Sequence, residues 1–159
     1  MMSCLVRIQL DYRGLQLITL VIFQKFIKGR EFSVDWFSDK QGVPIVIVPR
    51  ERLATRGGEV MTSRIEMISD IIESAENVGT LLKLRGPANL QGILDESGSF
   101  FFTDINLRFG SGALHTIHAG ADIPRMMFQE LVGQTVDKID NCIMDGSKMF
   151  RFHDAIFDS

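Results

Sequence analysis

A turn signal between two apolar runs constrains the fold of this chain most, because it predicts a β-hairpin. The turn is Asp95-Glu96-Ser97-Gly98. A four-residue loop there would pair Leu94 with Ser99 and Gln91 with Phe102. The sequence therefore predicts two antiparallel strands with a defined register.

The predicted register gathers oxygen donors on one face of the hairpin. Directly opposed residues share a face, and along a strand the face repeats at every second residue. The expected face carries Gln91, Phe102, Asp104 and Asn106, and Arg108 continues it. A carboxylate and two amide carbonyls suit Mg²⁺, and a guanidinium could meet phosphate charge. Spacing alone leaves open a surface hairpin whose polar residues are incidental.

Four sequence blocks extend this pattern from about residue 23 to about residue 133. In chain order they are residues 24–35, residues 48–53 with Gly57-Gly58-Glu59, Asn89-Leu90-Gln91 with residues 103–112, and residues 119–124. Together they resemble the C-terminal half of an ATP-grasp domain, and the carbamoyl-phosphate-synthase-like group is the nearest. Each block alone is a weak signal, whereas four in order are a strong one.

The resemblance implies a reaction and its cofactors. ATP-grasp enzymes phosphorylate a carboxylate to an acyl phosphate, which an amine or another nucleophile then attacks. The cofactors implied are ATP and Mg²⁺ (or Mn²⁺), because phosphoryl transfer depends on positioning and charge neutralisation. By the same match Glu31 would accept hydrogen bonds from the ribose hydroxyls. Gln24 and Phe26 would lie near the adenine and ribose.

The resemblance also assigns the remaining site residues. Asp104 would bridge the metal ions, Asn106 would bind the second ion and Gln91 the first. Arg108 would stabilise the transferring phosphoryl group or hold the acyl phosphate. Arg50 would contact an anion or the acyl substrate, and a solvated loop is its alternative. Many relatives carry glutamate at the positions of Asp104 and Gln24, so the carboxylate here is shorter.

The expected fold is α+β, with an antiparallel-rich sheet and helices packed mainly on one face, as in the second ATP-grasp subdomain. Residues 1–22 are expected to be an N-terminal extension or edge strand, and residues 23–159 a partial domain. Nothing before Phe23 resembles the family's lysine-bearing strand or its flexible glycine-rich loop. The sequence therefore suggests a fragment, a split-gene product or a truncated member.

Two functions remain open on these grounds. The first is the nucleotide- and metal-binding half of an ATP-dependent ligase, inactive alone and dependent on a missing N-terminal half or companion subunit. The second is a non-catalytic module for oligomerisation or partner binding. In either case the apolar run at residues 15–23 is expected at the contact of a homo-oligomer, because an uncovered apolar strand favours association.

Local patterns predict the individual strands and helices. Residues 17–27 should form a strand that pairs with residues 31–38, and residues 44–48 and 149–152 should form two more. Short helices are expected over residues 113–119 and after Asp122, where Gly133 would end the second.

A longer helix is expected after Thr62 or Ser63, because Glu66 could complete a capping box with Ser63. The apolar residues expected to face the sheet are Ile65, Ile68, Ile72, Ala75 and Leu82.

Charge and composition exclude other classes of function. A net charge of −3 without a basic stripe argues against nucleic-acid binding, and the run at residues 15–23 is too short to span a membrane. Cys4 and Cys142 are too few for a disulfide framework, so we expect a reducing, cytoplasmic location. His115 and His118 could share a metal, but no third ligand is apparent and structural histidines are favoured.

Overall fold

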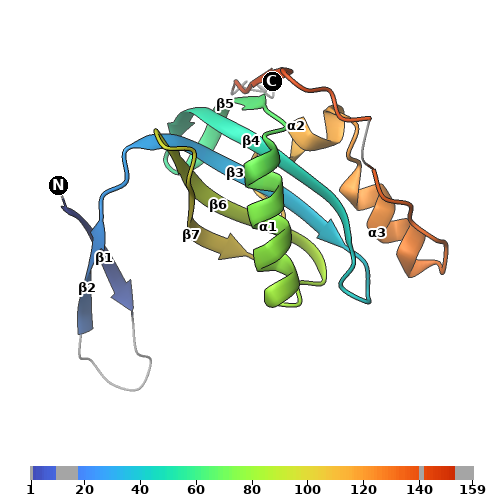
Figure 1. Ribbon diagram of the computed structural model, residues 1–159, viewed down its shortest axis with the longest axis horizontal. Helices are drawn as coiled ribbons and strands as arrows, with labels where there is room; N and C mark the ends of the chain where they lie inside the picture. The colour runs from blue at the N-terminus through green and yellow to red at the C-terminus, as the bar shows by residue number, and fades with distance from the viewer. Residues whose placement is uncertain (1, 10–17, 140–141, 153–159) are drawn as a thin grey trace, which may run out of the picture.

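The computed structural model describes residues 2–9, 18–139 and 142–152, which form two antiparallel sheets and three helices (Figure 1). The strands are β1 (Met2–Gln9), β2 (Ile18–Lys25), β3 (Gly29–Ser38), β4 (Pro44–Arg56), β5 (Glu59–Ile65), β6 (Gly86–Asp95), β7 (Phe100–Asn106) and β8 (Lys148–Phe150). The helices are α1 (Ser69–Leu81), α2 (Ala113–His118) and α3 (Ile123–Leu131). The larger sheet has the order β7-β6-β3-β4-β5-β8, and β1 pairs with β2 separately. The predicted α+β class is confirmed.

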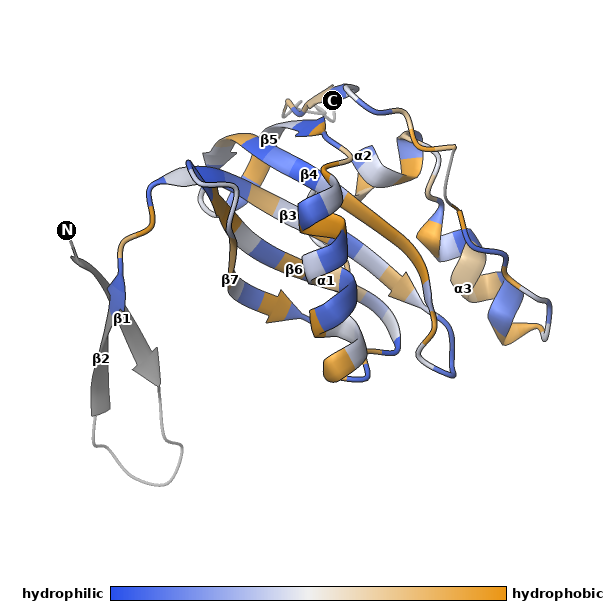
Figure 2. Ribbon diagram, viewed as in Figure 1, coloured by the Kyte–Doolittle hydropathy of each residue, from blue (hydrophilic) through white to orange (hydrophobic). Residues whose placement is uncertain are grey.

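One face of the large sheet packs against α1. Phe32, Val34 and Trp36 alternate along β3 with polar or opposite-facing residues, and they form a buried cluster with Ile71 and Ala75 of α1. Figure 2 shows this alternation of hydrophobic and hydrophilic residues along the strands. Burial of these apolar side chains fixes which face each strand turns toward the helix.

The opposite face is covered only in part, by α2 and α3. Phe37 and Val48 lie in a second buried cluster with Ile123 and Met126 of α3. As predicted, Asp122 caps α3, because its side chain accepts a hydrogen bond from the backbone N–H of Arg125 at 3.1 Å. The helices are thus divided between the two faces, and the uncovered part of this face lies over β3, β6 and β7.

The hairpin of β6 and β7 forms with a register that differs from the predicted one. Leu94 pairs with Phe100 rather than with Ser99, and the register shifts again between Gln91 and Gly92. Gln91 therefore pairs with Asp104, and the predicted pair of Gln91 with Phe102 is wrong. Phe102 instead packs against the core beneath α1.

Gly92 lies directly beside the register shift and leaves room for an aromatic ring. A Cβ atom at Gly92 would approach the ring of Phe100 to 2.4 Å. The rings of Phe100 and Phe102 meet edge to face with centroids 5.0 Å apart. The ring of Phe100 therefore needs the space over Gly92, and Phe102, two residues along the same strand, lies on the same side of the sheet.

Two predicted pairings of local elements are wrong. β2 pairs with β1 and not with residues 31–38, because β3 has β4 on one side and β6 on the other. The expected boundary between an N-terminal extension (residues 1–22) and a partial domain (residues 23–159) falls inside β2. This boundary stays a prediction. The apolar run at residues 15–23 lies outside the residues whose side chains the structure describes.

The predicted capping box is also wrong, since Thr62 and Ser63 lie in β5. Helix α1 begins later, at Ser69, and no side chain caps it. Ile65 consequently belongs to a strand, and Leu82 follows the helix and is exposed. The predicted last edge strand is confirmed as β8, which pairs with β5. Within the described ranges, the structure has no helix that is long and apolar enough to cross a membrane.

Candidate functional site

The strand registers place a continuous polar strip on the sheet face opposite α1. Ser33 pairs with Arg50 on one side and with Gln91 on the other, so all three side chains share this face. The strip, in order across the sheet, consists of Arg52, Arg50, Glu31, Ser33, Asp35, Asn89, Gln91, Asp104 and Asn106. It includes Glu31 and the three residues predicted to bind metal.

The outer end of the strip contains the predicted metal ligands. Gln91 lies opposite Asp104 and Asn89 lies opposite Asn106, so the predicted common face of Gln91, Asp104 and Asn106 is confirmed. Asp104 is exposed, and its carboxylate accepts hydrogen bonds from Asn106 Nδ2 at 2.7 Å and from the backbone N–H of Ile105 at 3.0 Å. This carboxylate and the neighbouring amide oxygens are hard donors that suit Mg²⁺.

Arg52 lies on β4, at the edge of the strip opposite β7, and its side chain is only 12% exposed. Its Nη1 donates a hydrogen bond to Gln91 Oε1 at 2.9 Å, and its Nη2 donates to the carbonyl oxygen of Gly58 at 3.2 Å. Glu31 lies on the other side, with Oε2 at 3.9 Å from Arg52 Nε. Arg52 therefore links the predicted ribose contact to a predicted metal ligand.

A buried carboxylate anchors the inner end of the strip. Asp35 is 2% exposed and accepts hydrogen bonds from Asn89 Nδ2 at 2.7 Å and from Arg50 Nη2 at 3.2 Å. Thr116 of α2 donates a further hydrogen bond to the same carboxylate. Asn89 in turn accepts from Gln91 Nε2 at 3.3 Å. Asp35 thus holds α2 against the sheet and fixes the orientation of Gln91 through Asn89.

Arg50 is completely buried, beneath the turn that precedes α2. A Cβ atom at Gly112 would lie 2.2 Å from Arg50 Nη1, so the close approach of this turn requires glycine. Arg50 Nη1 has no hydrogen-bond partner among the described residues. In this conformation Arg50 pairs with Asp35 and is out of reach of a ligand. Its catalytic role stays a prediction that requires the turn to move.

The predicted nucleotide contacts and Arg108 are accessible from solvent. Gln24 lies in β2, Phe26 is 50% exposed, and Glu31 begins the polar strip on β3. Arg108 follows Asn106 and is exposed, and its Nη1 donates to the carbonyl oxygen of Phe109 at 3.0 Å. The strip brings Glu31 and the metal-ligand residues together. Gln24 and Phe26 precede it along the chain.

His115 and His118 have different surroundings. His115 is buried, and its ring nitrogens hydrogen bond to Ser63 Oγ at 2.8 Å and to Ser147 Oγ at 3.1 Å. Burial and then the nearby charge of Arg50 lower the pKa of His115 below its ordinary value. His118 is exposed. In the part of the chain that the structure describes, no three His, Cys, Asp or Glu residues form a metal-binding group.

Sequence reasoning did not identify Asp35 and Thr116 as parts of the site. A charged residue within the apolar stretch of β3 was a usable signal for Asp35, because buried charges require partners. Its partners come from β4, β6 and α2, and only the register reveals them.

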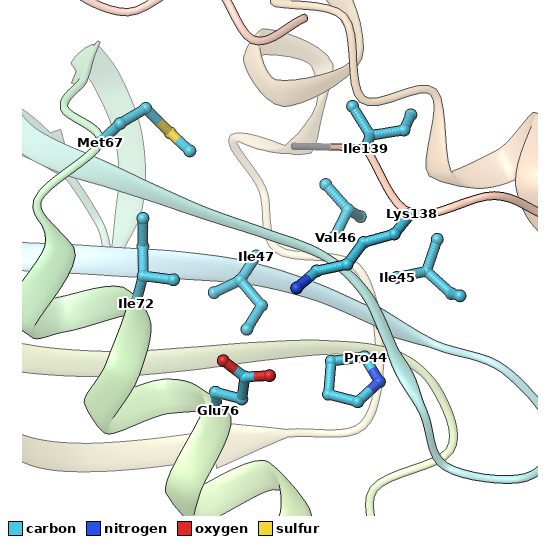
Figure 3. A pocket seen from close by; sticks show the side chains of 9 residues that line it. All are labelled: Pro44, Ile45, Val46, Ile47, Met67, Ile72, Glu76, Lys138 and Ile139. Carbon is cyan, nitrogen blue, oxygen red and sulfur yellow. The ribbon is translucent and has the colours of Figure 1, made fainter. Parts of the chain in front are cut away.

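A small cavity of about 100 Å³ lies away from the polar strip (Figure 3). Its lining comes from α1, β4 and the segment around Ile139, and it is mainly apolar. It belongs to the packing between α1 and the edge of the sheet. Within the polar strip, Glu31 and Asp104 are exposed, whereas Ser33, Asp35, Arg50 and Asn89 are buried.

Comparison with known proteins identifies similar sequences and folds. A family model described as "ATP-grasp in the biosynthetic pathway with Ter operon" matches residues 17–147. Pyruvate carboxylase of Rhizobium etli, with a T882A substitution and acetyl coenzyme A, is similar over 80% of this chain, with a TM-score of 0.65 and 16% identity. N5-carboxyaminoimidazole synthetase of Staphylococcus aureus, complexed with ADP, is similar over 76%, with a TM-score of 0.63 and 13% identity.

The biotin carboxylase domain of Hydrogenobacter thermophilus 2-oxoglutarate carboxylase, in complex with MgADP and bicarbonate, is similar over 80% of this chain, with a TM-score of 0.61 and 16% identity. At such identities the likeness establishes the fold alone. The match covers 13%, 34% and 30% of the three structures, respectively, so this chain spans about a third of their length or less.

Proposed function

The chain belongs to the ATP-grasp family whose model is described as "ATP-grasp in the biosynthetic pathway with Ter operon", and we propose that it supplies the nucleotide- and magnesium-binding half of an ATP-dependent ligase. The proposed ligase is of the carbamoyl-phosphate-synthase-like group and joins a small carboxylate to an amine or related nucleophile. The chain corresponds to the C-terminal half of the ATP-grasp domain.

One observation carries the proposal: Gln91 and Asp104 oppose each other in the β6–β7 register, with Asn106 on the same face. Three residue types that the family uses for metal therefore share one surface. Glu31 lies on the same strip, linked to Gln91 through Arg52. This grouping supports a joint site for a nucleotide and its metal.

The donors fit magnesium by their chemistry. Asp104 offers an exposed carboxylate, and Asn106 and Gln91 offer amide oxygens beside it. We propose that these three residues hold the ion. When bound, Mg²⁺ would neutralise charge on the phosphate oxygens of ATP.

The remaining residues would position the substrates. Glu31 would orient the ribose, with Gln24 and Phe26 near the adenine. Arg108, exposed beyond Asn106, would hold negative charge on the transferring phosphoryl group. The carboxylate substrate attacks the terminal phosphorus of ATP, ADP leaves, and the acyl phosphate then reacts with the nucleophile to release phosphate. Arg50, which is buried beneath the turn at Gly112, would contact an anion or the acyl substrate only after that turn moves.

We propose that the rest of the ATP site comes from another segment, either elsewhere in the same polypeptide or in a companion subunit. The 159 residues contain no counterpart of the family's lysine-bearing strand. A homo-oligomer that uses the run at residues 15–23 is part of the proposal. The alternative is a non-catalytic module for oligomerisation or partner binding, which the exposed residues of the strip equally permit.

Equilibrium binding of ADP with Mg²⁺ distinguishes these two functions. The nucleotide-binding half should bind MgADP measurably by calorimetry, and Asp104→Ala should weaken that binding. By itself the chain should not turn ATP over. Absence of MgADP binding would favour the non-catalytic module, and robust turnover that Asp104→Ala abolishes would refute the half-site proposal.

A further inference from the structure

Gln91 presents its carbonyl oxygen to Arg52, although a metal ligand should present that oxygen to the ion. Arg52 Nη1 donates to Gln91 Oε1 at 2.9 Å. The amide is fixed in this orientation from its other end, because Gln91 Nε2 donates to Asn89 Oδ1 at 3.3 Å. Asn89 is itself held by the buried carboxylate of Asp35 at 2.7 Å.

A guanidinium and a divalent cation cannot share this oxygen without a cost. Arg52 is mostly buried, so its positive charge is poorly screened and repels a second cation nearby. The hydrogen bond also occupies one of the two lone pairs of the oxygen, which leaves less electron density for the cation. Both effects oppose metal binding at Gln91.

Arg52 has an alternative acceptor at hand. Its Nε is buried and makes no hydrogen bond in the described part of the chain, and Glu31 Oε2 lies 3.9 Å from it. A small movement toward Glu31 would release Gln91 Oε1 and still leave the guanidinium paired. The side chain is therefore placed between the metal-binding and nucleotide-binding ends of the strip.

We propose that Arg52 is a positioning residue that occupies the carbonyl oxygen of Gln91 in the metal-free protein and must yield it before a divalent cation binds there. The inference rests on the proposed function, because it takes Gln91 and Asp104 as metal ligands. It adds an internal competitor for the metal, which lowers metal affinity in the protein without nucleotide.

The sign of the expected effect separates competition from a merely structural role. Arg52→Gln should tighten binding of Mn²⁺, used alone as the probe, by about tenfold, which corresponds to loss of one hydrogen bond to a charged group. A residue that only supported the fold would weaken metal binding when removed. Arg52→Met keeps the aliphatic stem and provides a second variant if Arg52→Gln folds poorly.

The measurement is titration of the full chain with Mn²⁺ by calorimetry or by electron paramagnetic resonance. Arg56→Gln is the matched control, because it removes the same charge from an exposed position at the end of β4. This control should change the Kd by less than about twofold, since exposed charges are screened. In a Gln91→Ala background, Arg52→Gln should bring no further gain, because the contested oxygen is gone.

The outcomes separate this inference from the proposed function. If wild type and Arg52→Gln bind Mn²⁺ equally while Asp104→Ala does not bind it, the metal site stands and the role of Arg52 is refuted. If none of these variants binds Mn²⁺, with or without ADP, the metal site itself is wrong and both proposals fail. Tighter binding by both Arg52→Gln and Arg52→Met, but not by Arg56→Gln, supports the inference.

Discussion

Gln91 of β6 lies directly opposite Asp104 of β7 on the polar face of the sheet, one residue beyond a register shift in the hairpin. The two side chains reach this arrangement by strand pairing alone. Asp104 is exposed, so its replacement changes the chemistry of the face without emptying the core.

Replacing Asp104 should therefore affect binding and not stability. Asp104→Ala should abolish or strongly weaken MgADP binding, because it removes the only carboxylate among the three proposed ligands. Asp104→Glu should keep binding, since it retains the charge. Calorimetric titration measures the affinity, and urea unfolding should show a stability change within about 0.5 kcal/mol for both variants. Equal affinity of wild type and Asp104→Ala would remove Asp104 from the metal site.

Replacing Asp35 should instead lower stability, because Asp35 and its partner Arg50 are both buried. Asp35→Asn leaves the guanidinium of Arg50 without its counter-charge, although Arg50 has no exposed surface. We expect the free energy of unfolding to fall by about 3 kcal/mol. Chemical denaturation measures it, and Asp137→Asn, an exposed change of the same kind, should have little effect. A loss of less than about 1 kcal/mol would show that Arg50 finds another partner.

The hairpin shows how a sequence-based prediction can be right about a face and wrong about a register. The observed turn shifts the pairing by one residue, so that Leu94 meets Phe100, and the bulge at Gln91 shifts it by one more. Because the two shifts together move the pairing by two residues, Asp104 still faces the same side of the sheet as Gln91. Among Gln91, Phe102, Asp104 and Asn106, the four residues predicted to share this face, only Phe102 changes sides, because it lies between the two shifts.

The first shift arises in the turn itself, where Asp95 and Ser99 close a three-residue loop and Gly98 has a positive φ. The second shift, at the bulge between Gln91 and Gly92, appears only in the pairing of the folded strands, beside the packing of Phe100 over Gly92 and against Phe32 of a different strand. The hydrogen bonds of Asp35 could not be predicted from local sequence either, because its partners lie on β4, β6 and α2. The capping of α3, by contrast, involves only neighbours in the chain, and the sequence predicted it correctly.

Gly79 tests how tightly α1 packs on the sheet. A Cβ atom there would lie 2.4 Å from the ring of Trp36, which is fully buried and donates a hydrogen bond to Ser38 Oγ at 3.2 Å. Alanine improves helix propensity by about 1 kcal/mol, but the overlap with a rigid ring costs more.

We therefore expect Gly79→Ala to destabilise the protein by about 1–2 kcal/mol in urea unfolding. The control is Thr80→Ala, at the next and exposed position of the same helix, which should be neutral or slightly stabilising. A Gly79→Ala protein as stable as wild type would mean that Trp36 can move away from α1.

The lowered pKa of His115 predicts a loss of stability on mild acidification. Its imidazole is hard to protonate mainly because it is buried, and also because it faces the positive charge of Arg50. Asp35 acts in the opposite direction, and His118 acts with Arg50. In the unfolded chain the same ring titrates at about pH 6.5. Between that pH and the lower folded pKa the unfolded state therefore binds more protons than the folded state, so this stability is fully present above the unfolded pKa and is lost as pH falls through the folded pKa.

Urea unfolding at about pH 7.5 and about pH 5.5 measures this contribution. Wild type should lose more stability between these values than His115→Gln, which cannot titrate. His118→Gln removes an exposed histidine three residues away on the same helix and should retain the pH dependence of wild type. Because glutamine can still hydrogen bond to Ser63 or Ser147, the comparison isolates the proton from the contacts of the ring. Equal pH dependence of wild type and His115→Gln would show that protonation of this buried ring is not coupled to folding.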